Sequence, residues 1–190
     1  MLFGFILLGC EPSVVSPSGF ARYVMKEKNG LHKLCQIGDY EYKVDYIPIE
    51  LEALRKIGNP LTQERYVHAI KNFEEHVYLV LTIKMNNGKN IGKEVRERLS
   101  DEEMNKVRFS LAPDFELKIS DRSYPCKLYH LEEMALAGVG LRFLLVFEVG
   151  DTHRGADDYL FSFDDHYFGK EKCLFNFRKS DLNKIPEIKF

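Results

Sequence analysis

The stretch from His76 to Met85, His-Val-Tyr-Leu-Val-Leu-Thr-Ile-Lys-Met, decides the fold class. Its alternate positions are apolar, and an extended strand would carry them on one face: Val77, Leu79, Leu81, Ile83 and Met85. Tyr78 and Val80 lie on the opposite face. Because both faces are apolar at one end, we predict a central strand of a sheet.

A second stretch with the same pattern covers residues 140–149. Its alternate positions form one apolar face, made of Leu141, Phe143, Leu145, Phe147 and Val149. Leu144 and Val146 extend the apolar character to the other face, so we predict a second central strand. Weaker alternation predicts further strands over residues 36–46, 115–119, 124–131, 158–163, 172–178 and 185–190. Pro125 favours an edge position for its strand, since proline has no N–H to donate.

Short helices are expected where caps and charges mark the ends of a segment. The predicted helices cover residues 48–58, 62–74 and 101–109. Pro48 opens the first helix and Gly58 closes it, with acidic residues early and basic residues late, which suits the helix dipole. Thr62 is the predicted N-cap of the second helix. Ser100 and Glu103 have the spacing of a capping box before the third.

The composition is that of a folded domain. The chain has 190 residues, of which 45% are hydrophobic and 29% charged, which argues against a disordered chain or a long coiled coil. We predict a mainly β protein with a few short helices, folded as one antiparallel β-sandwich-like domain over residues 20–190. The net charge of −2 is far from the strongly basic balance of a nucleic-acid binder, so no nucleic-acid partner is expected.

The first nine residues, Met-Leu-Phe-Gly-Phe-Ile-Leu-Leu-Gly, carry no charge and precede Cys10. The run is too short to span a bilayer as a helix, which takes about 20 apolar residues. It has the character of the apolar region of a secretory signal. Its end, Leu7-Leu8-Gly9-Cys10, resembles the lipobox of bacterial lipoproteins. The resemblance implies a signal peptide at residues 1–9, cleavage before Cys10, and a diacylglycerol on the thiol of Cys10.

The resemblance also implies a location. The residues after Cys10 are polar or small, so residues 10–19 would form a lipidated tether between a membrane and the domain. The protein would then lie in the cell envelope, with the outer membrane favoured. Glu11 is similar in charge to the Asp that retains some enteric lipoproteins at the inner membrane, so either membrane stays open. Residues 1–9 lack the Lys or Arg of family signals, and the alternative is a buried N-terminal strand with an ordinary core cysteine.

Beyond Cys10, the cysteines are Cys35, Cys126 and Cys173. This odd number allows at most one disulfide among them and leaves one thiol, and the sequence does not identify the pair. Their wide spacing, without a Cys-x-x-Cys, argues against a zinc site. Cys173 alternates with Phe175 and Phe177, which predicts a buried and inert thiol.

One polar loop is the best candidate for chemistry. Residues 150–158 join two predicted strands and contain Asp151, His153, Arg154, Asp157 and Asp158. Carboxylates beside an imidazole can bind a divalent cation. A loop between hydrophobic strands is also polar simply because it is in water, and we favour this interpretation. Asp164-Asp165-His166 lies in the next connection, and because neighbouring hairpin loops alternate ends, we expect no joint site.

Two further patterns have a functional and a structural interpretation. His130 and Glu132 would share one face of a strand as an acid–base pair, although a surface hydrogen bond is the favoured interpretation. Tyr40, Tyr42 and Tyr46 would form an aromatic binding row, but a place in the sheet core is favoured. The sequence contains no motif of a hydrolase, a phosphate loop or a calcium site, so we predict no catalytic residue, metal or cofactor.

We therefore expect a membrane-anchored envelope lipoprotein with a non-catalytic role in binding or assembly with an envelope protein. Two alternatives stay open. One is an envelope-associated hydrolase that uses the carboxylates and the histidine of the 150–158 loop, which a deep pocket containing Asp151 and His153 would favour. The other is an inhibitor or immunity-type lipoprotein, which a projecting loop without a pocket would favour.

Overall fold

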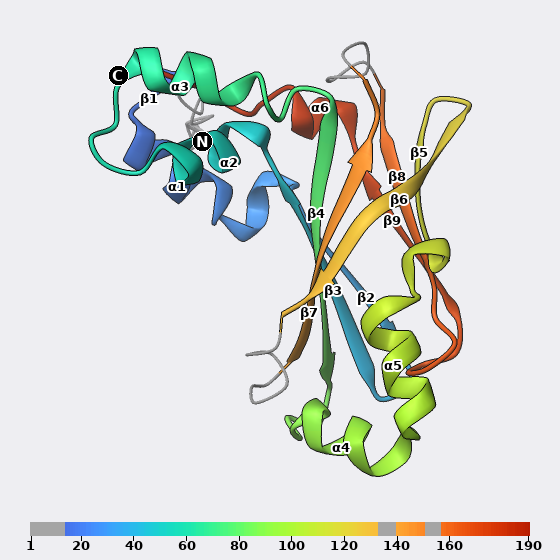
Figure 1. Ribbon diagram of the computed structural model, residues 1–190. Coiled ribbons are helices and arrows are strands. Elements are labelled where there is room, and N and C mark those ends of the chain that lie inside the picture. The colour runs from blue at the N-terminus through green and yellow to red at the C-terminus, as the bar shows by residue number, and fades with distance from the viewer. Residues whose placement is uncertain (1–13, 133–139, 151–156) are drawn as a thin grey trace, which may run out of the picture.

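The computed structural model describes residues 14–132, 140–150 and 157–190. Within these ranges, one antiparallel sheet has eight strands in the order β2-β3-β4-β7-β6-β5-β8-β9 (Figure 1). Its strands are β2 (His32–Ile37), β3 (Tyr40–Ile47), β4 (His76–Met85), β5 (Phe115–Ile119), β6 (Arg122–Leu131), β7 (Gly140–Glu148), β8 (Tyr159–Asp164) and β9 (Lys172–Phe177). The prediction of a mainly β, sandwich-like single domain is confirmed.

The two strands with the clearest apolar alternation lie inside the sheet, as predicted. β4 pairs with β3 on one side and with β7 on the other, and β7 pairs with β4 and β6. Leu79, Leu81, Phe143 and Leu145 are fully buried. A strand with neighbours on both edges and apolar side chains on its faces has its backbone groups paired and shielded from water.

The sheet forms two layers because β6 changes partners halfway along its length. Residues 122–125 pair with β5, whereas the pairing with β7 runs from Cys126 to Leu131, with a bulge between Cys126 and Leu128. Strands that pass from one layer to the other commonly do so at a bulge. The prediction that Pro125 marks an edge strand is wrong. Pro125 lies where β6 exchanges one neighbour for the other, and there the missing N–H is tolerated.

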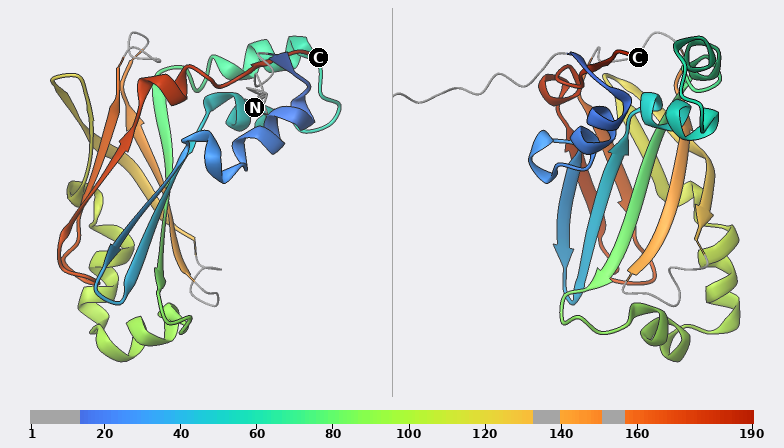
Figure 2. Two further views of the ribbon diagram at one scale, coloured as in Figure 1. Left: turned by 180° about the vertical axis from the view of Figure 1, so that it is seen from behind. Right: turned by 90° about the vertical axis from the view of Figure 1, so that its left-hand side faces the viewer.

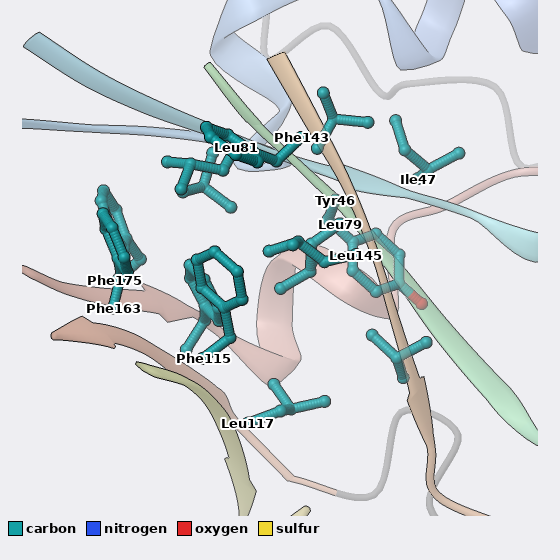
Figure 3. Close-up of a cluster of buried hydrophobic side chains, with 14 of the residues drawn as sticks. Tyr46, Ile47, Leu79, Leu81, Phe115, Leu117, Phe143, Leu145, Phe163 and Phe175 are labelled. Carbon is teal, nitrogen blue, oxygen red and sulfur yellow. The ribbon is translucent and has the colours of Figure 1, made fainter. Parts of the chain in front are cut away.

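Aromatic side chains fill the space between the layers. Phe115 of β5 lies 6.3 Å from Phe143 of β7 and 4.9 Å from Phe163 of β8, between ring centroids. Figure 3 shows Phe115 and Phe163 facing Leu79, Leu81 and Phe143 of the opposite layer. The edge strands β2 and β9 lie side by side, so the two layers also meet along their outer margin (Figure 2).

The three predicted helices are present and begin where their caps indicated. They are α2 (Ile49–Ile57), α3 (Gln63–Ile70) and α5 (Asp101–Phe109). Thr62 accepts a hydrogen bond from the backbone of Arg65, and Ser100 forms the expected capping box with Glu103. α3 ends at Ile70 rather than at residue 74, and a turn leads from there into β4.

The fold begins earlier than predicted. Helix α1 (Pro17–Val24) has Ser16 as its N-cap and Phe20 fully buried. Strand β1 (Val14–Val15) pairs in parallel with β10 (Glu187–Ile188), the short last strand. The tether prediction is therefore wrong for residues 14–19, which belong to the folded domain. Residues 10–13 and the predicted signal peptide lie outside the described residues.

Other elements were not expected from the sequence. They are α4 (Ile91–Arg98), α6 (Lys179–Leu182) and the 3₁₀ turns Glu27–Asn29 and Ala112–Asp114. The prediction of one strand over residues 36–46 is also wrong, because the chain reverses there and forms the β2–β3 hairpin. Gly38 makes this reversal with a φ of 55°, a left-handed conformation that glycine adopts at little cost.

A polar contact fastens this hairpin to α1. His32 Nδ1 lies 2.6 Å from Asp45 Oδ1 across the hairpin, and His32 Nε2 lies 2.8 Å from the carbonyl oxygen of Val24. Lys43 Nζ approaches the same Asp45 oxygen at 3.2 Å. Burial on its own would raise the pKa of Asp45, but the hydrogen bonds and charges of His32 and Lys43 outweigh it and hold that pKa below its ordinary range.

Asp45→Asn is expected to destabilise the protein in a pH-dependent way. A carboxylate with a depressed folded pKa stabilises the fold above its unfolded pKa, and this contribution is lost as the pH falls through the folded value. The variant should lose about 1 kcal/mol at pH 7, and the difference from wild type should shrink below about pH 4. Urea unfolding at pH 7 and pH 3 measures it, with the exposed Asp39→Asn as control. An equal loss at both pH values would contradict the explanation.

Candidate functional site

The end of the molecule nearest to Cys10 in the chain is built from helices. We call α1, α2, α3 and the β1–β10 pair the helical end (Figure 1). α1 contacts α2, β1 and β10, and α2 contacts α3, so these elements form one connected surface. Both β1, where the described chain starts, and Phe190, where it stops, lie at this end. α4 and α5 lie at the opposite end of the sandwich (Figure 2).

The helical end carries large apolar side chains in water. Those exposed there are Val14, Met25, Leu61, Val67 and Phe190. Met25 is 78% exposed, at the C-cap of α1. Beside it, an apolar hollow of about 390 Å³ lies between α1 and α2, with Ala21, Leu51, Leu54 and Leu61 among its lining residues. Met25 and Leu61 also line this hollow, so two of the exposed side chains share one apolar surface, and such surface is typical of a site of contact with a partner or a membrane.

Basic side chains surround Met25. Arg22, Lys26 and Lys28 are all exposed, and Glu27 is the one acidic residue between Arg22 and Lys28. Apolar side chains bordered by Lys and Arg suit the boundary between lipid headgroups and acyl chains. The helical end therefore combines two features of an interfacial surface.

The chain distance to Cys10 is short. Cys10 lies outside the described residues, but only Glu11, Pro12 and Ser13 separate it from Val14. Four peptide steps span at most about 14 Å. A group attached to Cys10 would therefore stay close to Val14. In the part of the chain that the structure describes, no helix has the length and apolar character needed to cross a bilayer.

The 150–158 loop is described only in part. Asp151, His153 and Arg154 lie outside the described residues. Asp157 accepts a hydrogen bond from the Ser120 hydroxyl. Asp158 accepts one from the backbone N–H of Lys179 at 2.8 Å and one from Asn176 at 3.3 Å. These bonds, the backbone one first, lower the pKa of Asp158.

Asp157 and Asp158 also line an open hollow of about 450 Å³ on the outer side of β5, β8 and β9. Asp158 stabilises the start of α6 through its hydrogen bond from Lys179. Asp157 stabilises the β5–β6 turn through its hydrogen bond from Ser120. Both carboxylates thus have a structural task in the described part of this loop.

Asp164, Asp165 and His166 do not join that loop. Asp164 is the last residue of β8 and Asp165 and His166 follow it, whereas Asp158 precedes the start of β8, so the six-residue strand separates the two groups by about 20 Å. Asp157 and Asp158 therefore lie at one end of β8, and Asp165 and His166 at the other. His166 Nε2 lies 3.6 Å from Asp114 Oδ1, and burial raises the pKa of Asp114.

Asp165 is 1% exposed and organises the β8–β9 connection. Its carboxylate accepts hydrogen bonds from the Tyr42 hydroxyl at 2.5 Å and from the backbone N–H groups of Tyr167, Phe168, Gly169 and Lys170. Gly169 N also donates to the Tyr42 hydroxyl oxygen at 2.8 Å. Burial first, and then the bond to Asp165, raise the pKa of Tyr42 far above its ordinary value, so the hydroxyl stays a neutral donor. We call this group the Asp165 knot.

The remaining sequence candidates are structural. Among the described residues no hydrogen bond joins Glu132 to His130, neither as an acid–base pair nor as the favoured surface bond; both Glu132 carboxylate oxygens accept from Arg142 Nη1 at 2.6 Å across β6 and β7. Tyr40, Tyr42 and Tyr46 are buried, so the favoured prediction that they belong to the core is confirmed. Across residues 14–132, 140–150 and 157–190, no group of three or more His, Cys, Asp or Glu side chains could hold a metal ion.

Sequence reasoning missed the apolar surface of the helical end. Met25 and Leu61 stand in segments without strong periodicity, and their exposure depends on how α1 and α2 pack. The sequence signal for α1 was Ser16 followed by Pro17, a capping residue before a proline at the first helical position. A helix predicted from this signal would have placed Arg22, Met25 and Lys26 on the same face, because Met25 and Lys26 follow Arg22 by three and four residues.

Comparisons with known proteins give no functional information. No protein-family model matches the chain, and no curated protein matches it. Among solved structures, the chain is similar to the crystal structure of a novel protein of unknown function from Burkholderia pseudomallei, with 10% sequence identity and a TM-score of 0.39. The match covers 91% of this chain and 94% of that one.

Proposed function

We propose that the protein is an envelope lipoprotein, anchored through lipid on Cys10, whose folded domain has a non-catalytic role in binding or assembly with an envelope protein. The observation that carries this proposal is the short distance along the chain between the lipobox-like Leu7-Leu8-Gly9-Cys10 and the helical end. Three residues separate Cys10 from Val14, and the exposed apolar side chains and the basic residues around Met25 lie on that end.

This arrangement supports a defined orientation. A lipid on Cys10 holds the helical end at the bilayer, because the intervening chain is at most about 14 Å long. Met25, Leu61 and Phe190 then enter the headgroup region, and Arg22, Lys26 and Lys28 meet anionic headgroups. α4 and α5, at the other end of the sandwich, point away from the membrane and are accessible to a protein partner.

The lipid supplies most of the membrane affinity. Each buried methylene contributes about 0.8 kcal/mol, so one chain binds reversibly and two or more give stable anchoring. Anchoring in turn concentrates the domain near other envelope proteins, which raises the effective concentration for a weak contact. The hydrolase alternative is not proposed here, because the two described carboxylates of the 150–158 loop, Asp157 and Asp158, already accept hydrogen bonds from Ser120, Lys179 and Asn176.

Cys10→Ser tests the anchor. In a bacterium that processes lipoproteins, the wild-type chain should fractionate with membranes, with an intact mass equal to residues 10–190 plus acyl chains. Cys10→Ser should lose the acyl mass and leave the acylated membrane pool almost completely, because no other thiol stands at the cleavage position. Cys35→Ser, which removes a cysteine from the folded domain, should behave as wild type. Density separation of the wild-type membranes distinguishes the favoured outer membrane from the inner one.

A wild-type chain that is soluble, unacylated and still begins at Met1 would overturn the proposal. The resemblance of residues 7–10 to a lipobox would then be accidental, and the alternative of an N-terminal core strand would replace it. An acylated Cys35→Ser beside a non-acylated Cys10→Ser would identify the lipid site by residue.

A further inference from the structure

The margin where the two layers meet is a seam between β2 and β9. These strands stand at the two ends of the sheet order and lie side by side. Lys33 Nζ of β2 lies 5.8 Å from the centre of the Phe177 ring of β9. From this contact both strands run toward the β8–β9 loop. On β2 the side chains that follow on the same face are Cys35 and Ile37, and on β9 they are Phe175 and Cys173.

At the other end of the seam, the β8–β9 connection packs closely against the end of β2. A Cβ added to Gly169, in the β8–β9 connection, would stand 2.7 Å from Ile37 Cγ2 and 2.8 Å from the Tyr42 hydroxyl oxygen. Between the Lys33–Phe177 contact and the Ile37–Gly169 contact stand Cys35 on β2 and Cys173 on β9, close enough that the Cys35 thiol helps to raise the pKa of the Cys173 thiol. Both are free thiols.

We propose that Cys35 and Cys173 are the pair that forms a disulfide bond, which joins β2 to β9 and closes the seam between the two layers. The Lys33–Phe177 contact on one side and the Ile37–Gly169 contact on the other hold β2 and β9 side by side where the two cysteines stand. The long chain between the two cysteines makes the cross-link effective, since closing a long loop restricts the unfolded chain most.

The difference in exposure between Cys35 and Cys173 decides which of the two thiols reacts with the oxidant first. Cys35 is partly exposed, whereas Cys173 is fully buried. Burial, together with the neighbouring Cys35, raises the pKa of the Cys173 thiol far above its ordinary value. Cys35 is therefore the thiol that an outside oxidant reaches first.

The oxidant is a disulfide, either of a thiol oxidoreductase or of oxidised glutathione. The Cys35 thiolate attacks one sulfur of that disulfide, forms a mixed disulfide and releases the other sulfur as a thiolate. Cys173 then loses its proton and attacks the Cys35 sulfur, which releases the second thiolate. Two thiols of the protein are oxidised, one disulfide of the oxidant is reduced to two thiols, and the two protons leave to solvent and to those thiolates.

Cys126 is the thiol left over. It is buried in β6, opposite Phe147 of β7, and its Sγ lies 3.2 Å from the Leu128 carbonyl oxygen. Burial raises its pKa to about 11. Cys126 lies on β6, between β7 and β5 in the sheet order, and not on either strand of the seam, so it is the thiol that we expect to stay reduced while the seam pair is oxidised.

The test uses the full chain carrying Cys10→Ser, which leaves three cysteines. After incubation with oxidised glutathione, the intact mass should fall by about 2 Da, as expected for one disulfide. Alkylation after unfolding should then find one thiol, and peptide mapping should place it on Cys126. Adding Cys126→Ser should leave the mass change intact, whereas adding Cys35→Ser should abolish it. The oxidised form should melt at least about 5 °C above the reduced form.

Three alkylatable thiols after oxidation, or a glutathione adduct that stays on Cys35, would overturn the proposal. Since Cys35 is partly exposed, Cys35→Ser should fold, so a lost mass change reports the missing bond rather than misfolding; circular dichroism of the variant verifies this. The assay runs on a chain without a lipid site, so its result is independent of the anchoring experiment. Formation of the bond in the cell does rest on the proposed function. An envelope lipoprotein lies outside the cytoplasm, in a compartment that is oxidising enough for disulfides to persist.

Discussion

Phe115→Ala should lower the free energy of unfolding by about 3–5 kcal/mol, the range for truncating a buried phenylalanine. Phe115 is 1% exposed and has aromatic neighbours in both layers. Its ring centroid lies 4.9 Å from that of Phe163, 5.8 Å from that of Tyr129 and 6.3 Å from that of Phe143. An alanine there leaves a cavity between layers that cannot close without moving β5, which is hydrogen-bonded on both edges.

The matched control for this substitution is Phe109→Ala. Phe109 is the last residue of α5 and is 76% exposed, so its truncation should change the stability by no more than about 0.5 kcal/mol. Urea unfolding of both variants measures the difference, and an unchanged m-value shows that the same surface is exposed on unfolding. Equal losses for Phe115→Ala and Phe109→Ala would mean that Phe115 does not bridge the layers.

Asp165→Ala should cost about 3 kcal/mol or more, because it removes the acceptor of the Asp165 knot. Four backbone N–H groups and the Tyr42 hydroxyl donate to this carboxylate. Buried donors without an acceptor each carry a penalty of about 1–3 kcal/mol, part of which water entering the loop relieves. The β8–β9 connection should lose its fixed shape, and the contact between Gly169 and Ile37 at the seam should loosen with it.

Asp164→Ala is the control for the knot, since Asp164 is the adjacent acidic residue and is exposed. Thermal melts should show a drop of about 6 °C or more for Asp165→Ala and little change for Asp164→Ala. Tyr42→Phe, alone and combined with Asp165→Ala, separates the hydroxyl bond from the four backbone bonds. If the two single losses simply add in the double variant, Tyr42 and Asp165 do not act together and the knot is wrongly described.

Strong local patterns predicted the centre of the fold. β4 and β7 alternate over nine or more residues, and tertiary contacts reinforce that pattern on both faces. The ends of α2 and α5 were predictable because their caps are local hydrogen bonds and backbone preferences. In each of these elements the information lies within the segment itself.

The errors arose where a local pattern has two solutions. The parity of the apolar positions changes between Ile37 and Tyr40, and Gly38 between them marks a hairpin rather than a continuous strand. Residues 16–19 combine serine, proline and glycine, which is typical of a tether, yet Ser16 and Pro17 also make a helix start. α4 has only Ile91, Gly92 and Val95 buried, too few to show a helical period.

The candidate site was predictable only in part. The lipobox resemblance is contained in four consecutive residues, so it needs no structure. The apolar surface of the helical end, the Asp165 knot and the Cys35–Cys173 pair each join residues that are distant in the chain. Tyr42 and Asp165 are separated by 123 positions. Such meetings follow from the way the sheet closes, and no spacing in the sequence encodes them.

The passage of β6 from one layer to the other has a consequence for how the molecule unfolds. Because residues 122–125 belong to the layer of β5 and residues 126–131 to the layer of β7, neither layer can lose its order while the other keeps a complete ladder. The two layers therefore behave as one cooperative unit rather than as two independently melting halves. A disturbance of the hydrogen bonds in either layer therefore reaches the other layer through the same ten-residue strand.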